Sequence, residues 1–334
     1  MSDGDATDEG IAGLPVEDAV DAVLEGDDGG HDRDAVRTAL GHVTADGAVS
    51  RDEVDEALSE ASMYVSTAET RTELASIELD EARAVAEPVA DVDAVAARLD
   101  EFASRLRAVE TRADALGDDL QALLDRSDEA DLFDVATGIG EVRADAAGVQ
   151  GAADELQVDV GEFKRWLVDP AVRYREFGGD VDALGTWLDE LADAVETLAG
   201  GGDRPADGVD RAVVWFDAEL HRRLLALLLA DLRAELADLR TLVGRELDVE
   251  VEGEFDVDHE ERLASLAAAL DDHDARLAAL GDRLDDLVRP AWRERFDDRL
   301  ESFAAALEGR EPPVDWGELQ AAFERHRPTG EGAA

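Results

Sequence analysis

The feature that most constrains this chain is an unbroken three-four spacing of apolar residues along two long segments. A repeat of 3.5 residues keeps one stripe of a helix facing a supercoiled partner, so the spacing predicts coiled-coil helices. The first stripe comprises Val92, Val95, Leu99, Phe102, Leu106, Val109, Ala113, Leu116, Leu120 and Leu123. The second comprises Leu132, Val135, Ile139, Val142, Ala146, Val149, Ala153, Leu156, Val160, Phe163 and Leu167.

The two striped segments are joined by a short polar link, DRSDEAD, at residues 125–131. Helices joined by so short a link most naturally fold back as an antiparallel hairpin. Alanine at three stripe positions would let the two arms approach closely. Four glycines, at 138, 140, 148 and 151, oppose the second arm, because each costs about 1 kcal/mol relative to alanine inside a helix.

Further helices follow this predicted hairpin. A shorter striped helix after Pro170 ends at GGGDRPADG, 200–208, and a helix at 209–246 has a wide apolar face that predicts a deep position in a bundle or a place at a subunit contact. A helix at 259–309 is expected to kink at Pro290. The period changes to two at 247–258, which predicts one minor β-hairpin at most. The predicted fold class is therefore all-α, an elongated bundle of long antiparallel coiled-coil helices with a small N-terminal helical module.

The domain organisation follows from where the heptad spacing begins and stops. Short helices without a heptad stripe are predicted before residue 65, and a short helix precedes the C-terminal tail. The predicted division is residues 1–12 disordered, 13–65 a small helical module, 66–199 the hairpin plus a third helix, 209–310 a second helical segment with long helices 209–246 and 259–309, and 311–334 a short helix with a flexible tail.

The charge balance is extreme, with 84 acidic residues against 32 basic ones and a net charge of -52. The acids are interleaved with apolar residues along the whole chain, which predicts the outer faces of ordered helices. Lys164 is the only lysine, and this acidic, lysine-poor composition resembles that of proteins from salt-accumulating haloarchaea. Molar salt shortens the Debye length to about 3 Å, so it would screen the self-repulsion of such a chain. The acidity is therefore expected to be a habitat adaptation.

Composition also excludes several kinds of chemistry. The chain has no cysteine, so it has no disulfide, no thiolate metal site and no cysteine nucleophile. The N-terminus lacks the order of a signal peptide, and the most apolar run, LLALLLADL at 224–232, is too short to span a bilayer. We therefore expect a soluble, cytoplasmic protein with no membrane partner.

One stretch, HVTADGAVSRDE at 42–53, nearly spells a calcium-binding loop. Gly47 and Glu53 occupy the sixth and twelfth loop positions, but His42 and Thr44 stand where the first and third carboxylates belong. Without those two charges calcium would bind poorly. The favoured interpretation is a turn at 46–47 and a capping box formed by Ser50 with Glu53.

Other candidate sites are weak. Residues 32–65 could form a DNA-reading helix pair, but acids outnumber arginines there, which disfavours nucleic acid without removing that alternative. The HEERL segment at His259 has leucine where a zinc helix needs its second histidine. His273 stands at a stripe position, where a polar residue usually fixes helix register. No nucleotide-binding or nucleophile motif occurs, so no catalytic, cofactor-binding or metal residue is assigned.

Seven aromatic residues recur around the predicted helix ends: Phe163, Trp166, Tyr174, Phe177, Trp187, Trp215 and Phe216. A ligand pocket is one interpretation of this group. Large rings that fill the corner between helices are the commoner one, so we expect these residues to belong to the core.

The segment SMYVSTAETRTELASIELDEA, residues 62–82, followed by acidic heptads, resembles the opening of soluble haloarchaeal coiled-coil proteins named halo transducer protein. The resemblance implies a part in signal relay and assigns no functional residue. The turn at 121–133 differs from the hairpin tip of membrane chemotaxis transducers, which argues against receptor activity.

These observations predict a non-enzymatic cytoplasmic scaffold or adaptor. Heptad helices would bind a protein partner or a second copy of the chain, and no cofactor is expected. The alternative is a DNA-binding transcriptional regulator that reads DNA with residues 32–65 and dimerises through the coiled coil.

Overall fold

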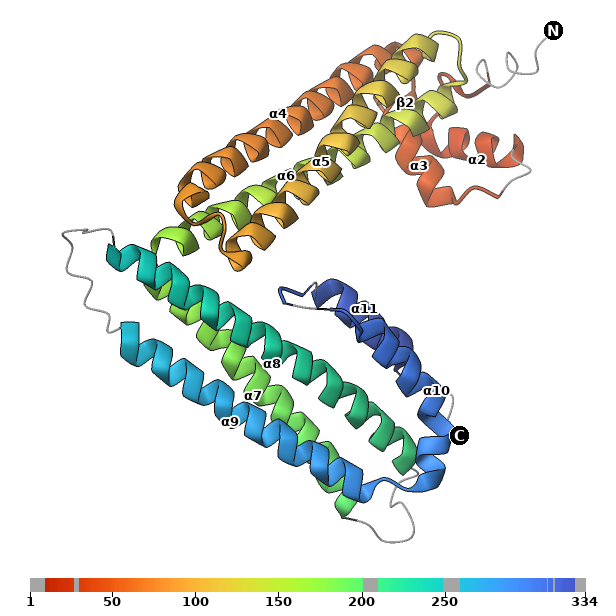
Figure 1. The fold of residues 1–334 in the computed structure, drawn as a ribbon. Coiled ribbons are helices and arrows are strands. Elements are labelled where there is room, and N and C mark those ends of the chain that lie inside the picture. The colour runs from red at the N-terminus through yellow and green to blue at the C-terminus, as the bar shows by residue number, and fades with distance from the viewer. Residues whose placement is uncertain are drawn as a thin grey trace. The chain divides into compact units, whose positions relative to one another are not determined.

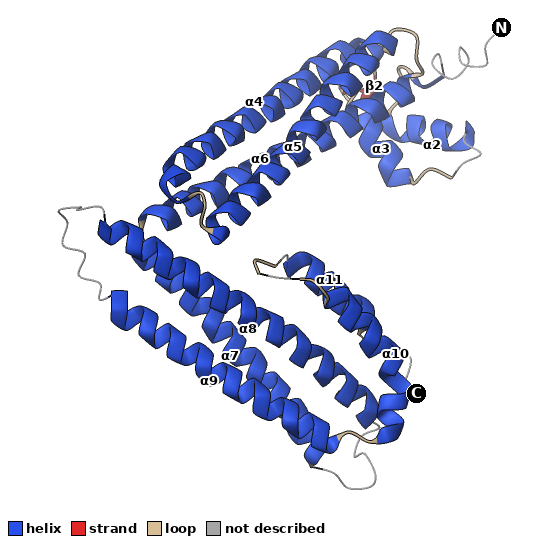
Figure 2. Ribbon diagram, viewed as in Figure 1, coloured by secondary structure: helices blue, strands red, loops and turns tan. Residues whose placement is uncertain are grey.

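The computed structural model describes residues 10–26, 30–200, 210–248, 259–310, 312–314 and 316–327. Almost all of this part is helical, and its strands form a two-stranded antiparallel sheet, so the predicted all-α class is confirmed (Figures 1 and 2). The hairpin predicted near 247–258 falls mostly on 249–258, which lies outside the described residues. Residues 247 and 248 belong to a helix, and the two-stranded sheet instead joins residues 44–45 to 48–49.

The elements are, in chain order, α2 (Val16–Gly26), α3 (Arg33–Gly41), β1 (Thr44–Ala45), β2 (Ala48–Val49), η1 (Arg51–Glu53), α4 (Val54–Ala86), η2 (Glu87–Val89), α5 (Asp93–Arg126), α6 (Leu132–Val168), α7 (Pro170–Ala199), α8 (Arg211–Asp248), α9 (His259–Leu287), α10 (Pro290–Leu307) and α11 (Trp316–His326). They divide into two compact units. Unit 1 comprises Met1–Glu87 with Arg98–Lys164, and unit 2 comprises Pro88–Ala97 with Arg165–Ala334.

Unit 1 is built around a bundle of α4, α5 and α6 (Figure 1). Helices α5 and α6 run antiparallel, since Arg105 donates to Asp159 at 2.7 Å and the rings of Phe102 and Phe163 lie 5.5 Å apart. This confirms the predicted hairpin. Helix α4 runs parallel to α6, because contacts such as Arg143 Nη1 to Glu60 Oε2, 3.1 Å, recur between residues separated by a constant number along the chain.

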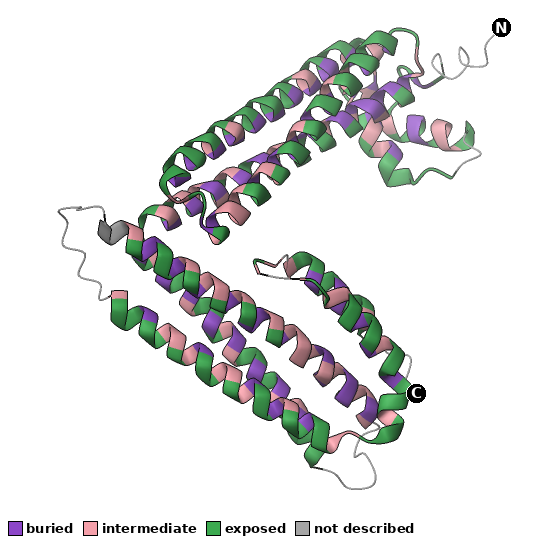
Figure 3. Ribbon diagram, viewed as in Figure 1, coloured by how far each residue is buried: buried purple, intermediate pink, exposed green. Residues whose placement is uncertain are grey.

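The predicted stripes of α5 and α6 form the core of this bundle (Figure 3). Every stripe residue is buried except Leu99, Leu120 and Leu167, which are half-buried. Two of the four glycines predicted to oppose α6 have a packing role. A Cβ on Gly138 would lie 2.9 Å from Leu123 Cδ1, and one on Gly140 would lie 3.1 Å from His42 Nε2. Glycine at these positions lets another side chain approach the helix backbone.

The N-terminal module consists of α2, α3 and the small sheet, and it is not separated from the bundle at residue 65. Helix α4 crosses that predicted boundary without a break and ends at Ala86. Its buried row is mostly alanine, a weak signal beside the leucines and valines of α5. Part of the segment predicted to be disordered is packed, since Ile11 is buried and the Gly13 amide next to that segment donates to the Val49 carbonyl at 2.8 Å.

Unit 2 contains a second three-helix bundle, of α7, α8 and α9 (Figure 1). Asp169 caps α7 by accepting from the Ala171 amide, with proline at the first helical position. Helices α7 and α9 are parallel to each other and antiparallel to α8. Helix α8 also packs against α10 and α11, which confirms its predicted deep position. The residue before Pro290 is extended, so the helix predicted at 259–309 is two helices.

Candidate functional site

Helix α4 carries apolar residues on two opposite faces. Its inner seam is buried in the bundle of unit 1 and comprises Val54, Ala57, Leu58, Ala61, Val65, Ala68, Thr72, Ala75, Leu79, Ala82 and Ala86. A second row, here called the outer seam, comprises Met63, Thr67, Thr70, Leu74 and Ile77. At 100° per residue this row lies almost opposite the inner one, and all five residues are exposed.

The outer seam repeats the heptad spacing of four and three residues over about 21 Å of helix. Its largest side chains face solvent, with Met63 62% exposed, Leu74 43% and Ile77 49%. Isolated apolar side chains are normal at a protein surface. A row of them at heptad spacing is instead typical of the helix face that packs against another helix in a coiled coil. The row therefore has the geometry of a helix-docking surface.

The two threonines of the outer seam have satisfied hydroxyl groups. Thr67 Oγ1 donates to the Met63 carbonyl at 2.7 Å, and Thr70 Oγ1 donates to the Ser66 carbonyl at 2.9 Å. Because the hydroxyls bond to their own helix backbone, the methyl groups are left for contact with other molecules. The seam is thus more apolar than its letters suggest, and it holds no ionisable group from Met63 to Ile77.

The edge of the seam that faces α6 is lined by ion pairs. Arg71 Nη1 lies 3.2 Å from Asp154 Oδ1, and Lys164 Nζ donates to Glu81 at 2.7 Å and to Glu78 at 3.0 Å. Glu81 and then Glu78 raise the pKa of Lys164 above its ordinary value, because they stabilise the ammonium form. These pairs neutralise charge along this edge.

The edge that faces α5 differs in composition from end to end. Its N-terminal half presents Ser59 and Ser66, and its C-terminal half presents Glu73 and Asp80, all four exposed. Asp80 accepts from Arg83 at 2.9 Å. The outer seam therefore has one edge whose charged groups are paired, although Glu78 and Glu81 share the single ammonium of Lys164, and one edge that changes from serine to carboxylate along the helix.

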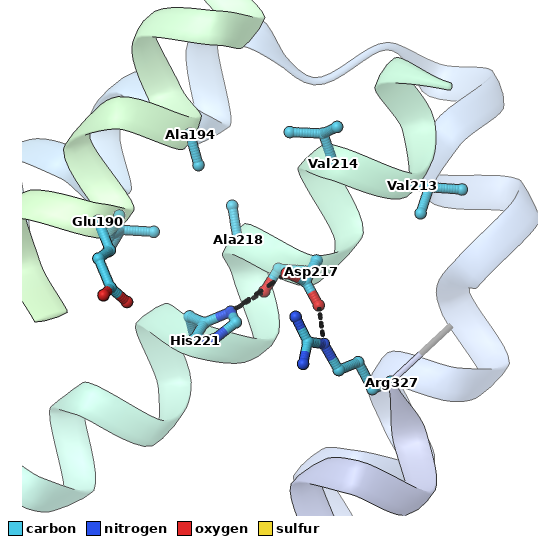
Figure 4. A pocket seen from close by; sticks show the side chains of 9 residues that line it. Glu190, Ala194, Val213, Val214, Asp217, Ala218, His221 and Arg327 are labelled. Atoms are coloured by element: carbon cyan, nitrogen blue, oxygen red, sulfur yellow. Dashed lines mark hydrogen bonds and ion pairs between the residues drawn. The ribbon is translucent and has the colours of Figure 1, made fainter. Parts of the chain in front are cut away.

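A hollow of about 420 Å³ in unit 2 is the other candidate (Figure 4). It lies between α7 and α8 beside the end of α11, and its polar residues are Glu190, Asp217, His221 and Arg327. Arg327 Nε donates to Asp217 Oδ1 at 3.1 Å, and His221 Nδ1 lies 2.9 Å from the Asp217 carbonyl oxygen. Among the residues that the structure describes, the lining has no hydroxyl or amine nucleophile, and the Arg327–Asp217 pair ties the end of α11 to α8.

The calcium-like stretch folds as a tight hairpin. Asp46 and Gly47 both have positive φ, of 51° and 83°, and form the predicted turn between β1 and β2. Ser50 is the predicted N-cap and accepts from the Asp52 amide at 3.2 Å. The predicted capping box with Glu53 is not formed, because the Ser50 amide that Glu53 would need already donates to the Val43 carbonyl at 2.9 Å.

The helix pair of the DNA-binding alternative, residues 32–65, is α3 and the start of α4 with the β1–β2 hairpin between them, and α2 packs against α3. The arginines of α3 are paired with carboxylates. Arg37 Nε donates to Glu17 at 2.7 Å, and Arg33 is paired with Asp21. Phosphate binding requires cations that can replace counterions, and these two are engaged with acids of the neighbouring helix.

The histidines lie in separate places. His273 packs against Gly185 of α7, where a Cβ would meet its Cε1 at 3.2 Å, and its buried Nδ1 has no hydrogen-bond partner. This contact is consistent with the predicted role in register. His259 Nδ1 lies 2.7 Å from the Tyr174 hydroxyl. Among the described residues, no cluster of three or more histidines and acids is arranged to hold a metal ion.

The seven aromatics do not form one corner. Six of them are buried, but Trp187 is 45% exposed, so its predicted place in the core is wrong. Phe163 contacts Phe102 in unit 1, whereas Phe216 stacks on Phe296 of α10 with centroids 4.4 Å apart. The buried rings therefore fill several separate cores.

Comparisons with protein families, with curated proteins and with solved structures give no match for this chain. No helix in the described ranges is long and apolar enough to cross a membrane. Of all the surfaces above, the outer seam of α4 is the one that sequence reasoning missed. The sequence signal for this surface is the four-three spacing of residues 63, 67, 70, 74 and 77. The signal is hard to recognise because two of these residues are threonines, which count as polar.

Proposed function

We propose that this protein is a non-enzymatic adaptor or scaffold that associates through a helix with a protein partner or with itself. The outer seam of α4 carries the proposal, because a heptad row needs a second helix to cover it. Helix α4 is also fixed on its opposite side by the inner seam. The docking surface is therefore held on a rigid element and needs no rearrangement to bind.

The sequence of the same helix supports a place in signal relay. Residues 62–82, which resemble the opening of the halo transducer proteins, contain the whole outer seam. A cytoplasmic, salt-adapted relay protein would use this surface to join components that do not otherwise meet. Relay by association requires no cofactor and no catalytic residue.

The test is site-specific photo-crosslinking in cells that carry the gene. A benzophenone amino acid at Leu74 should yield a discrete adduct, whereas the same group at Val158, an even more exposed position on α6, should not. Mass spectrometry of the adduct would identify another protein or a second copy, and either supports the proposal. No adduct at Leu74, or the same adducts from both positions, would contradict it.

Residues 32–65, which form α3, the β1–β2 hairpin and the start of α4, favour DNA reading as a second candidate, because such a helix pair can present one helix to a groove. A regulator of this kind would shift the mobility of DNA from near its own gene, and Arg37→Ala would weaken that shift. Unchanged binding by this variant, or no shift at molar salt, would remove the candidate.

A further inference from the structure

The net charge of the chain limits which molecules can bind to the outer seam. Each copy carries a net charge of -52, so two copies repel at most of their surfaces. The outer seam is a place where close approach meets no carboxylate, since its five residues are uncharged. It can therefore accept a second copy of an acidic chain if the edges also match.

We propose that the outer seam binds the outer seam of a second copy in antiparallel orientation, with the two-fold axis at Thr70. This inference rests on the proposed function, since it names the partner of the same surface. Met63 and Ile77 each lie seven residues from the axis, so Met63 faces Ile77 of the second copy. Thr67, three residues from the axis, lies within about 1.5 Å of the level of Leu74, which is four residues from it. Large side chains pack at the ends, and the two small Thr70 side chains meet at the centre.

The edges favour this orientation. In an antiparallel pair, the α5 edge of one helix faces the α5 edge of the other. The serine half then meets the acidic half, with Ser66 opposite Glu73 and Ser59 opposite Asp80. Each carboxylate thus faces a hydroxyl that can donate a hydrogen bond to it.

A parallel pair would bring unlike edges together. Its α5 edge would face the α6 edge of the second copy, and Glu73 would approach Glu78, a repulsion between like charges. In the antiparallel pair the α6 edges place Arg71 near Arg71 of the second copy. Each of these arginines is balanced by Asp154 of its own bundle, 3.2 Å away.

The absence of cysteine from the chain allows a direct test of the axis. Single variants Thr70→Cys, Met63→Cys, Ile77→Cys and Val158→Cys are oxidised in molar potassium chloride and resolved on a non-reducing gel. Thr70→Cys should form a covalent dimer. Met63→Cys and Ile77→Cys should each form little alone and should crosslink when mixed, because residues 63 of two antiparallel copies lie about 21 Å apart. Val158→Cys should remain monomeric.

Sedimentation of the unoxidised protein provides the second measurement. The natural chain should be a dimer at molar salt, and Leu74→Asp should raise its dissociation constant at least about tenfold. Val158→Asp is the matched control and should leave the dimer intact. Because residues 74 and 158 are exposed, circular dichroism should show unchanged helicity in both variants.

Two outcomes overturn the proposal. Self-crosslinking of Met63→Cys as strong as that of Thr70→Cys would show a parallel pair, and a monomeric natural chain at molar salt would exclude a second copy. A photo-adduct from Leu74 with a different protein would then leave the adaptor function standing. If that adduct also failed to form, both the dimer and the function would fall.

Discussion

The two three-helix bundles share one topology and differ in core chemistry. In each bundle the first and third helices are parallel and the middle helix is antiparallel. The buried row of α4 in unit 1 contains six alanines, whereas that of α7 in unit 2 is made mostly of leucine, valine and aromatic residues. The shared topology therefore accompanies heptad spacing in both bundles, and residue size is left to set how closely the helices approach.

The difference also appears in the contacts between the parallel helices. In unit 1, α4 and α6 are linked by ion pairs of Arg143, Arg71 and Lys164 with acids of the neighbouring helix. In unit 2, the corresponding helices are joined by the pair of Arg276 with Asp189 and by the contact of Tyr174 with His259. An alanine seam buries little apolar area per residue, so the packing of α4 in unit 1 depends on a close fit between helices. The packing of unit 2 depends instead on large buried side chains.

The largest expected effect comes from removing bulk in unit 2. Leu184 on α7 is fully buried, and Leu184→Ala should lower the free energy of unfolding by about 2–5 kcal/mol, because it removes apolar contacts and leaves a cavity. Denaturant unfolding at molar salt measures this change. Val158→Ala, at an exposed position on α6, is the control, and an equal loss there would contradict this expectation.

The corresponding change in unit 1 is to enlarge a buried side chain. Ala68 on α4 is fully buried, and Ala68→Leu should destabilise by about 1–3 kcal/mol, because the closely packed bundle has no room for three more carbons. Hydrogen exchange of peptides from α4 and α6 would locate the effect in unit 1. A stabilised protein would show instead that the alanine seam is loosely packed.

Two glycines of α6 sharpen the same point. A Cβ at Gly138 would meet Leu123 at 2.9 Å, whereas one at Gly151 meets nothing within 4 Å. Gly151→Ala should therefore stabilise by about 1 kcal/mol through helix propensity, while Gly138→Ala should destabilise despite the same propensity gain. Thermal unfolding of the two variants provides the comparison, and equal shifts of Tm would refute it.

How much the sequence predicts depends on residue type. The stripes of α5, α6, α7 and α8 are large and apolar, so spacing alone predicts the fold and most of its core. The inner seam of α4 was not predicted, because alanine and Thr72 carry a weak hydrophobic signal at positions that tertiary packing buries. The pairing of α4 with α6 depends on ion pairs between residues over 80 positions apart, which local patterns do not encode.

The candidate site escaped prediction for a related reason. In the sequence, Thr67 and Thr70 count as polar residues. Only the structure shows that their hydroxyl groups donate hydrogen bonds to the backbone of α4. The prediction for Trp187 was wrong in the opposite sense. This large aromatic residue on an amphipathic helix was assigned to the core, but its side chain is exposed. Burial of a side chain depends on which way its helix faces, and that is a property of the assembled bundle.

The smallest expected effect is a dependence of stability on pH that differs between the two units. His42 of unit 1 is half-buried against α6, where burial lowers its pKa below the ordinary value of 6.5 and Arg143 lowers it further, against an opposing effect of Glu60. Folding thus favours the neutral ring. This stabilisation is fully present above pH 6.5 and is lost as the pH falls through the folded-state pKa. Hydrogen exchange near α3 and α6 should therefore accelerate between pH 7 and pH 5, relative to unit 2, and His42→Gln should abolish this dependence. A dependence that survives in His42→Gln would assign the effect to other groups.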